Sequence, residues 1–276
     1  MADEYDKKKK KLNEFMERMA GEGVCVAFSG GVDSSVVLKA AAEAGKKKNG
    51  VLFGVMFDTF LHPKGDEETA RRVAAECGAA FAVISVNEME NPAILDNPPD
   101  RCYQCKKFLF TRLGAFAEAH HCRIVMDGTN ADDHGVYRPG LRAVSELGVK
   151  SPLAACGFTK EDVRRLAAEY GISVAGKPSN SCLATRLPYG QRLEAGLLRS
   201  IEEGEGILAG MGFRQVRLRI HGGIARIEVE AAQIPEFAAR GEEITALLKP
   251  LGFRYITLDL EGFRSGSMDI GQNTGQ

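Results

Sequence analysis

The sequence lacks a run of about 18 apolar residues, the length that a membrane-spanning helix needs, so it predicts no membrane partner. The first residues, MADEYDKKKKKLNEF, contain lysines but no apolar segment behind them, and this is not the pattern of a secretory signal. The lysine run is typical of the solvated first turns of a helix that continues through Leu12 and Phe15. We therefore expect a cytoplasmic protein.

A surplus of positive charge is also missing. Lys and Arg number 36 against 37 Asp and Glu, which gives a formal net charge of −1. Proteins that bind a nucleic-acid backbone usually carry a basic surplus, so the balance argues against a nucleic acid as partner, although a local basic face would not change the total. The 276 residues are enough for one large domain or two.

The cysteines do not form a pattern typical of disulfides or structural zinc. Their number is seven, which is odd, and a reducing compartment argues further against a disulfide framework. A structural zinc site usually takes four ligands, often from two CxxC pairs, but the chain has a single CxxC, Cys102 to Cys105. The thiols therefore indicate redox, nucleophilic or metal chemistry of another kind.

Apolar runs alternate with helical stretches through the first two-thirds of the chain. The strand-like runs are VCVAFS (24–29), LFGVMFD (52–58), FAVISV (81–86), RIVMDGT (123–129) and the short KSPLA (150–154). Strands that are apolar on both faces and separated by helices predict an α/β fold with a doubly wound parallel sheet. A loop with NPPDRCYQC is expected before a helix near 106–120, and a helix with a Thr159 cap is expected to end at Gly171.

The pattern changes after the segment KPSNSCLATRLPYGQRL (177–193). A helix (194–210) is followed by QVRLRI (215–220), an HGG turn, IARIEVE (224–230), a further helix and RYITLDL (254–260). This order predicts a smaller C-terminal α+β domain with a hairpin. We place the first domain at residues 1–190 and the second at 191–276.

The stretch AFSGGVDSSVVL (27–38) has the features of a phosphate-binding loop. A strand ends, Gly30 and Gly31 turn the chain, and a helix begins, so that free backbone N–H groups and the helix dipole face an anion. Hydroxyl donors come from Ser29, Ser34 and Ser35. The Gly-Lys-Ser/Thr ending of a Walker loop is absent. An ordinary glycine-rich strand–helix turn is the alternative.

A second polar stretch, MDGTNADD (126–133), follows the fourth predicted strand. Gly128 and Thr129 allow close approach to a ligand, Asn130 can bridge two groups, and Asp132 or Asp133 could bind a metal. The alternative is an Asx-rich turn in which these side chains cap the backbone. The position of this stretch after a parallel strand favours a ligand-binding role.

The cysteines separate into two groups. Cys25, Cys77 and Cys122 lie at apolar positions of strands or helices and are expected in the core, and Cys156 is ambiguous. Cys182 is in the polar loop SNSCLATR beside Arg186. Three thiolates from two loops, Cys102, Cys105 and Cys182, could converge on a [4Fe–4S] cluster with one open iron. Alternatively, Cys182 alone is a nucleophile or sulfur donor helped by Arg186, or the CxxC pair is a redox dithiol.

The loop SGGVDSS resembles the SGGxDS loop of the PP-loop ATP pyrophosphatase superfamily, whose fold is of the adenine nucleotide alpha hydrolase type. The resemblance implies that this loop, including Val32, binds the pyrophosphate half of ATP, that Asp33 helps to hold Mg²⁺ or the phosphates, and that adenine lies near Met56. The element GTN-x-x-D resembles the stretch that lines the nucleotide pocket of the superfamily. The implied reaction is adenylation of an acceptor oxygen.

Further motifs resemble the LarE family of ATP-dependent sulfur transferases, which serve nickel-pincer cofactor biosynthesis. These are PSNSCLATRLPYG, RCYxCK, YRPG (137–140), SPL (151–153) and ARIEV, and the resemblance extends over nearly the whole chain. Some members sacrifice one cysteine as the sulfur source, whereas others hold a [4Fe–4S] cluster on three. With Cys102, Cys105 and Cys182, this chain is similar to the three-cysteine members.

The LarE resemblance also implies the substrate and partners. The substrate would be pyridinium-3,5-biscarboxylate mononucleotide, whose carboxylates are adenylated and converted to thiocarboxylates. Sulfide or a sulfur-delivery system would be a partner, and the small domain would build a homo-oligomer such as a hexamer. Arginines of the small domain would bind the substrate or its phosphate, so that Arg217, Arg219 and Glu228 are predicted substrate residues, together with Arg186 of the Cys182 loop.

Side-chain alternation gives independent support for a polar face in the small domain. Arg217 and Arg219 point away from the apolar face of their strand, and Arg226 and Glu228 do so in the next. Paired arginines suit a phosphate dianion. A solvated sheet face with cross-strand ion pairs is the alternative.

Three other functions compete with sulfur transfer to a mononucleotide. A PP-loop tRNA thiolase can also hold a three-cysteine cluster, but it needs a basic RNA-binding surface. An amide-forming PP-loop synthetase of the NAD- or GMP-synthetase kind needs no cysteine pair. A nucleotide-binding module without enzymatic activity would release no pyrophosphate from ATP.

Overall fold

The structure is a computed structural model that describes residues 3–46, 48, 50–62, 67–135, 138–175, 181–213, 215–264 and 268. The chain forms two compact units. The first comprises Met1–Phe60, Lys64–Asn91 and Asp100–Asn180, and the second comprises Leu61–Pro63, Pro92–Pro99 and Ser181–Gln276. Two short segments of the second unit therefore come from within the range that the sequence assigns to the first domain.

The first unit alternates strands with helices. Its strands are β1 (Val24–Ala27), β2 (Leu52–Thr59), β3 (Ala80–Val86) and β4 (Ile124–Met126). Its helices are α1 (Glu4–Met19), α2 (Val32–Gly45), α3 (Glu67–Cys77), α4 (Arg101–Ala119), α5 (Gly140–Glu146), α6 (Pro152–Ala155) and α7 (Lys160–Glu169). The predicted α/β class is confirmed, because the four strands pair in parallel in the order β3-β2-β1-β4.

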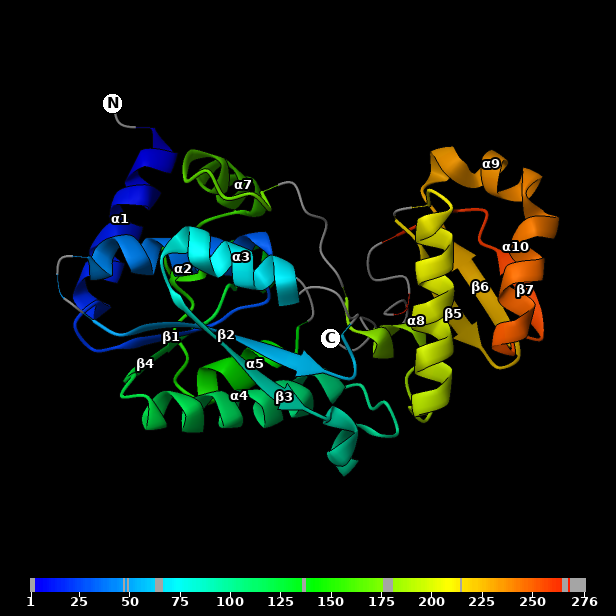
Figure 1. The fold of residues 1–276 in the computed structure, drawn as a ribbon, viewed down its shortest axis with the longest axis horizontal. Coiled ribbons are helices and arrows are strands. Elements are labelled where there is room, and N and C mark those ends of the chain that lie inside the picture. The colour runs from blue at the N-terminus through cyan, green and yellow to red at the C-terminus, as the bar shows by residue number, and fades with distance from the viewer. Residues whose placement is uncertain are drawn as a thin grey trace. The chain divides into compact units, whose positions relative to one another are not determined.

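Helices cover both faces of this sheet (Figure 1). Val24 and Val26 of β1 pack into a core with α1, α2, α3 and α7, whereas Cys25 packs into a second core with α4. Alternate residues of a strand point to opposite faces, so the continuous apolar run of β1 supplies both cores. The carboxyl ends of β1 and β4 lead into the two polar stretches that the sequence singled out.

Two local expectations for this unit were wrong. The fifth strand at 150–154 is reduced to a single bridge between Met126 and Lys150, because Pro152 begins the short helix α6. The CxxC pair does not lie in a loop. Helix α4 begins at Arg101, directly after Asp100, since no proline or glycine interrupts the chain from there to Leu113.

Helix α7 matches its prediction closely. The Thr159 side chain caps its start by accepting the Asp162 N–H, and the Asp162 side chain accepts the Thr159 N–H, which completes a capping box. Gly171, with φ of +67°, follows its end. Lys8 of α1 forms an ion pair with Asp162 at 2.7 Å, so part of the lysine run binds α7. Among the described residues, no helix is long and apolar enough to cross a membrane.

The second unit has a three-stranded sheet in the order β5-β6-β7. Its elements are α8 (Ala195–Gly210), β5 (Arg217–His221), β6 (Ile224–Glu228), α9 (Ile234–Ala239), α10 (Gly241–Leu248) and β7 (Tyr255–Leu258). The predicted hairpin is present: β5 and β6 are antiparallel, and the turn between them contains Gly222 at φ of +59°. β7 then pairs in parallel with β6.

Candidate nucleotide and sulfur-transfer site

The phosphate-binding loop connects β1 to α2 in a compact turn. Gly30 has φ of +68°, and a Cβ at this position would lie 3.0 Å from Cβ of Ala70, so the turn requires glycine. Ser35 Oγ donates to Gly31 O at 2.8 Å, and Gly31 N donates to Ser29 Oγ at 3.3 Å. These bonds order the first turn of α2, where backbone N–H groups have no intrahelical acceptor and are available to an anion.

The stretch after β4 lies against this turn. A Cβ on Gly128 would lie 2.8 Å from the backbone N of Ser34, so only glycine permits this approach. The side chain of the buried Asn130 donates to Asp33 Oδ1 at 3.1 Å. Asn130 and Asp33 are 97 residues apart in the sequence. Their hydrogen bond joins the two polar stretches into one site at the carboxyl edge of the sheet.

Asp33 has a second partner that the sequence did not predict. Lys160, the first residue of α7, forms an ion pair with Asp33 Oδ2, and its backbone N–H donates to Asp132 Oδ2 at 2.8 Å. A carboxylate beside the phosphate-binding loop is the type of ligand that Mg²⁺ prefers, and in this structure the Lys160 ammonium group is paired with the carboxylate of Asp33.

Asp132 and Asp133 have the capping roles given as the alternative. Asp132 accepts the Lys160 N–H at the start of α7, and Asp133 accepts the Asn130 N–H at 3.0 Å and pairs with Arg138 at 2.8 Å. Asp127 is a further buried carboxylate that the sequence did not single out. It accepts hydrogen bonds from Ser151 Oγ at 2.7 Å and from Thr129 Oγ1 at 2.6 Å, which fixes the stretch that Asn130 belongs to.

Burial separates the seven cysteines as the sequence predicted. None of the seven forms a disulfide, and the side chains of Cys102, Cys105 and Cys182 are partly exposed. The other four are buried, which raises their pKa: to about 12 for Cys25, to about 11 for Cys77, and in the same direction for Cys122 and Cys156. A raised pKa keeps a thiol protonated and unreactive. The ambiguous Cys156 therefore belongs with the core.

The CxxC pair lies on the first two turns of α4. Cys102 and Cys105 are three residues apart and so share a helix face. The buried Arg101 donates an N–H to Cys102 Sγ at 3.5 Å. Within the described part of the chain, no three His, Cys, Asp or Glu side chains form a group suited to a metal, and Cys182 belongs to the other unit. The three-thiol cluster stays a prediction.

The loop with Cys182 is held by a buried arginine. Arg186 is 1% exposed and pairs with both carboxylate oxygens of Glu205 on α8, at 2.7 and 2.9 Å. Its remaining N–H group donates to Ser181 Oγ at 2.7 Å and to Cys182 O at 3.3 Å. Glu205, in mid-helix, carried no sequence signal for this role. The residues preceding Ser181 in the PSNSC motif lie outside the described residues, as does Tyr137 of the YRPG motif.

The polar face of the β5–β6 hairpin is buried, not solvated. Arg219 pairs with both oxygens of Glu228 at 3.1 and 3.0 Å, and Arg226 pairs with Glu228 at 3.0 Å. Arg219 also donates to the carbonyl oxygen of Thr185 at 2.8 Å. This last bond joins the hairpin to the loop that contains Cys182, within one unit.

Arg217 differs from its neighbours on this face. It is buried, yet no described carboxylate lies within ion-pair distance of its guanidinium group, which donates to Val216 O. Burial lowers the pKa of Arg217, the nearby Arg186 and Arg219 lower it further, and the carboxylates of Glu205 and Glu228 act in the opposite direction without reversing the shift. A buried cation that lacks an anionic partner has the charge to bind an anion.

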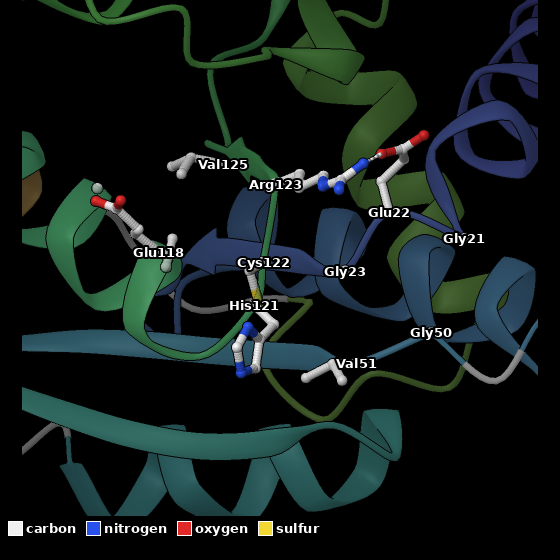
Figure 2. A pocket seen from close by; sticks show the side chains of 12 residues that line it. Gly21, Glu22, Gly23, Gly50, Val51, Glu118, His121, Cys122, Arg123 and Val125 are labelled. Carbon is white, nitrogen blue, oxygen red and sulfur yellow. Dashed lines mark ion pairs between the residues drawn. The ribbon is translucent and has the colours of Figure 1, made fainter.

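A pocket of about 860 Å³ lies at the other edge of the sheet (Figure 2). Its wall includes Gly23, Val51 and Arg123, the residues next to the amino ends of β1, β2 and β4, and Arg123 pairs with Glu22 at 3.5 Å. The phosphate-binding loop follows the carboxyl end of β1, so this pocket is separate from the candidate site.

Comparison with known proteins agrees with this geometry. A family profile described as a PP-loop domain matches residues 4–94. The chain is 38% identical over 246 residues to the pyridinium-3,5-bisthiocarboxylic acid mononucleotide synthase of Lactiplantibacillus plantarum. The aligned region covers 89% of this chain and 88% of the synthase. The chain is 37% identical to an uncharacterised protein of Synechocystis, over 88% and 91% of the two chains. A tRNA-specific 2-thiouridylase of Geobacter metallireducens is 31% identical, over 71% of this chain and 62% of its own.

The parallel sheet, the SGGVDSS loop and the profile match define an ATP-using enzyme of the PP-loop class. Because the similarity to the Lactiplantibacillus synthase extends over most of both sequences, the chain belongs to the LarE family within that class. The resemblance inferred from the motifs is thereby confirmed.

Proposed function

We propose that this protein is an ATP-dependent sulfur transferase that converts the carboxylates of pyridinium-3,5-biscarboxylic acid mononucleotide to thiocarboxylates. The observation that carries the proposal is the hydrogen-bonded connection, within one unit, between the Cys182 loop and the arginine face that includes Arg217. A thiol and a buried cation without an anionic partner suit a sulfur donor beside a phosphate-bearing substrate.

The nucleotide half of the reaction uses the first unit. The loop Ser29–Ser35 and the helix N-terminus bind the pyrophosphate of ATP, with Gly128, Thr129 and Asn130 alongside and adenine near Met56. Asp33 would hold Mg²⁺, which neutralises phosphate charge. Asp132 supports the site by its bond to α7. A substrate carboxylate oxygen attacks the α-phosphorus, pyrophosphate leaves, and an acyl adenylate forms.

The sulfur half of the reaction uses the accessible thiols. Cys102, Cys105 and Cys182 would hold a [4Fe–4S] cluster, which would supply a bound sulfide; the alternative donor is the Cys182 sulfur itself. A sulfide supplied by the cluster would displace AMP: the C–S bond forms as the C–O bond to AMP breaks, and AMP leaves with that electron pair. If Cys182 is the donor, its thiolate displaces AMP in the same way to give a thioester. β-Elimination then removes the Cys182 Hα and breaks the Cβ–Sγ bond, which leaves dehydroalanine at position 182 and the thiocarboxylate on the substrate. Each carboxylate consumes one ATP. With the cluster as donor, external sulfide or a delivery protein would restore the sulfide that is transferred.

The substrate phosphate is assigned to the hairpin of the second unit. Arg217 and Arg219 bind the phosphate dianion, while Glu228 orients Arg219 by its two hydrogen bonds. Arg186, in the loop that contains Cys182, is assigned to the substrate as well. We also propose that the chain assembles as a homo-oligomer and acts in the cytosol, where ATP is present and its thiols stay reduced.

The proposal is tested by incubating the enzyme, prepared without oxygen, with the biscarboxylate mononucleotide, ATP, Mg²⁺ and sulfide. We expect one pyrophosphate per thiocarboxylate and a substrate mass increase of about 16 Da for each oxygen replaced by sulfur. Bulk tRNA at moderate salt serves as the competing substrate, because 2-thiouridylases are among the relatives. Sulfur incorporation into tRNA but not into the mononucleotide would favour the thiolase alternative.

A further inference from the structure

The phosphate-binding loop has no lysine of its own. The residues from Ser29 to Ser35 offer backbone N–H groups, hydroxyl groups and the carboxylate of Asp33, so their only formal charge is negative. The triphosphate that this loop binds is itself highly negative. A Walker loop solves the same problem with a lysine in its sequence. Here a positive charge has to come from another element.

Lys160 brings such a charge from α7. It lies 127 residues from Asp33 in the sequence, yet its ammonium group pairs with Asp33 Oδ2, while Asn130 donates to Oδ1. Its backbone is fixed independently, by the bond from its N–H to Asp132 and by the capping box at Thr159. The side chain can therefore change partner without moving the helix.

The exposure of this ion pair suits an exchangeable contact. The side chains of Lys160 and Asp33 are 32% and 23% exposed, whereas those of Arg186 and Glu205 are 2% and 13% exposed. Ion pairs that water reaches contribute little net stability, so a stronger partner can replace either member. Lysine is also a flexible point charge with three donors, which can follow a phosphate oxygen.

We infer that Lys160 is a further binding residue of the nucleotide site: it neutralises Asp33 while the site is empty, and it releases Asp33 to the divalent cation and contacts the phosphates when ATP binds. The inference rests on the ATP-binding part of the proposed function and is independent of the sulfur chemistry. The Lys160 side chain thus has two anionic partners that compete for it, the Asp33 carboxylate and the phosphates of ATP.

Lys160→Met tests this exchange, because methionine keeps the unbranched length and leaves the backbone bond to Asp132 in place. Removing the competitor should tighten binding of Mn²⁺ alone by about threefold or more, measured by electron paramagnetic resonance of free Mn²⁺. The same change should weaken ATP binding by about tenfold or more in calorimetry, because a charge-assisted contact to phosphate is lost. Lys160→Arg should restore part of the ATP affinity.

Lys8→Met is the matched control, because Lys8 also forms an ion pair with α7, at Asp162, but not with the loop. It should change neither affinity. Asp33→Asn, alone and combined with Lys160→Met, should abolish the gain in Mn²⁺ binding if that gain acts through Asp33. Tighter binding of Mn²⁺ together with weaker binding of ATP by Lys160→Met supports the inference. If Lys160→Met binds both Mn²⁺ and ATP as the unchanged protein does, or binds both more weakly, the inference is overturned. Neither result bears on whether sulfur transfer occurs.

Discussion

Cys182→Ser is expected to abolish thiocarboxylate formation while leaving ATP affinity unchanged. The hydroxyl group replaces the proposed sulfur donor or cluster ligand, but the loop keeps the hydrogen bonds that the side chains of Thr185 and Arg186 donate to the Cys182 carbonyl oxygen. The nucleotide loop belongs to the other unit and does not depend on this side chain. Product mass spectrometry and ATP calorimetry on the same preparation measure the two effects separately.

Cys156→Ser is the matched control for this change. Cys156 is buried in the core of the first unit, where its pKa is raised, so it should not take part in sulfur transfer. Substitution should leave the product yield per folded chain as in the unchanged protein. Undiminished sulfur transfer by Cys182→Ser would eliminate the role proposed for Cys182, whichever of the two donor mechanisms operates.

Glu228→Gln is expected to destabilise the second unit strongly. Glu228 is fully buried and accepts hydrogen bonds from both Arg219 and Arg226, so the change leaves two cations without their shared anion. Breaking a buried ion pair from one side costs about 3–5 kcal/mol. That is a large share of a typical unfolding free energy of roughly 5–15 kcal/mol. The urea midpoint, followed by far-ultraviolet circular dichroism, should fall by about 1 M or more.

Arg217→Met, on the same face of the hairpin, should weaken substrate binding without lowering the stability of the fold. Since Arg217 is buried, makes no ion pair with a described carboxylate and has a lowered pKa, removing it should leave the urea midpoint unchanged or raise it. KM for the mononucleotide should rise by about tenfold or more, because a charge-assisted bond to phosphate is lost. Glu243→Gln, at an exposed ion pair with Arg240, should alter neither quantity. A lower midpoint for Arg217→Met with unchanged KM would assign Arg217 to the fold alone.

Local patterns were sufficient to predict most of the fold. The apolar runs that became β1 to β4 alternate with helices over short distances, and the Thr159 cap and Gly171 end of α7 depend on neighbouring residues. The start of α4 was wrong because the Pro98–Pro99 pair indicated a longer loop, although a helix tolerates prolines just before its first residue. The fifth strand was wrong because an apolar run of five residues is consistent with either strand or helix.

The site was predictable in its residue types but not in its contacts. The motifs singled out Asn130 and Asp33 separately, and the two residues meet because the sheet topology fixes where the strand ends lie. The contact of Lys160 with Asp33 and the support of Arg186 by Glu205 join elements that have no fixed spacing in the sequence. Such pairs depend on tertiary packing, and neither Lys160 nor Glu205 lies in a motif that the sequence analysis recognised.

The account depends most on the three accessible thiols acting together, and the iron and acid-labile sulfide content of protein reconstituted without oxygen tests this directly. We predict about four irons per chain. Cys102→Ser, Cys105→Ser and Cys182→Ser should each lower this content, whereas Cys122→Ser should not. Iron well below this level in the unchanged protein, or full iron in all three variants, would contradict a site built from these thiols.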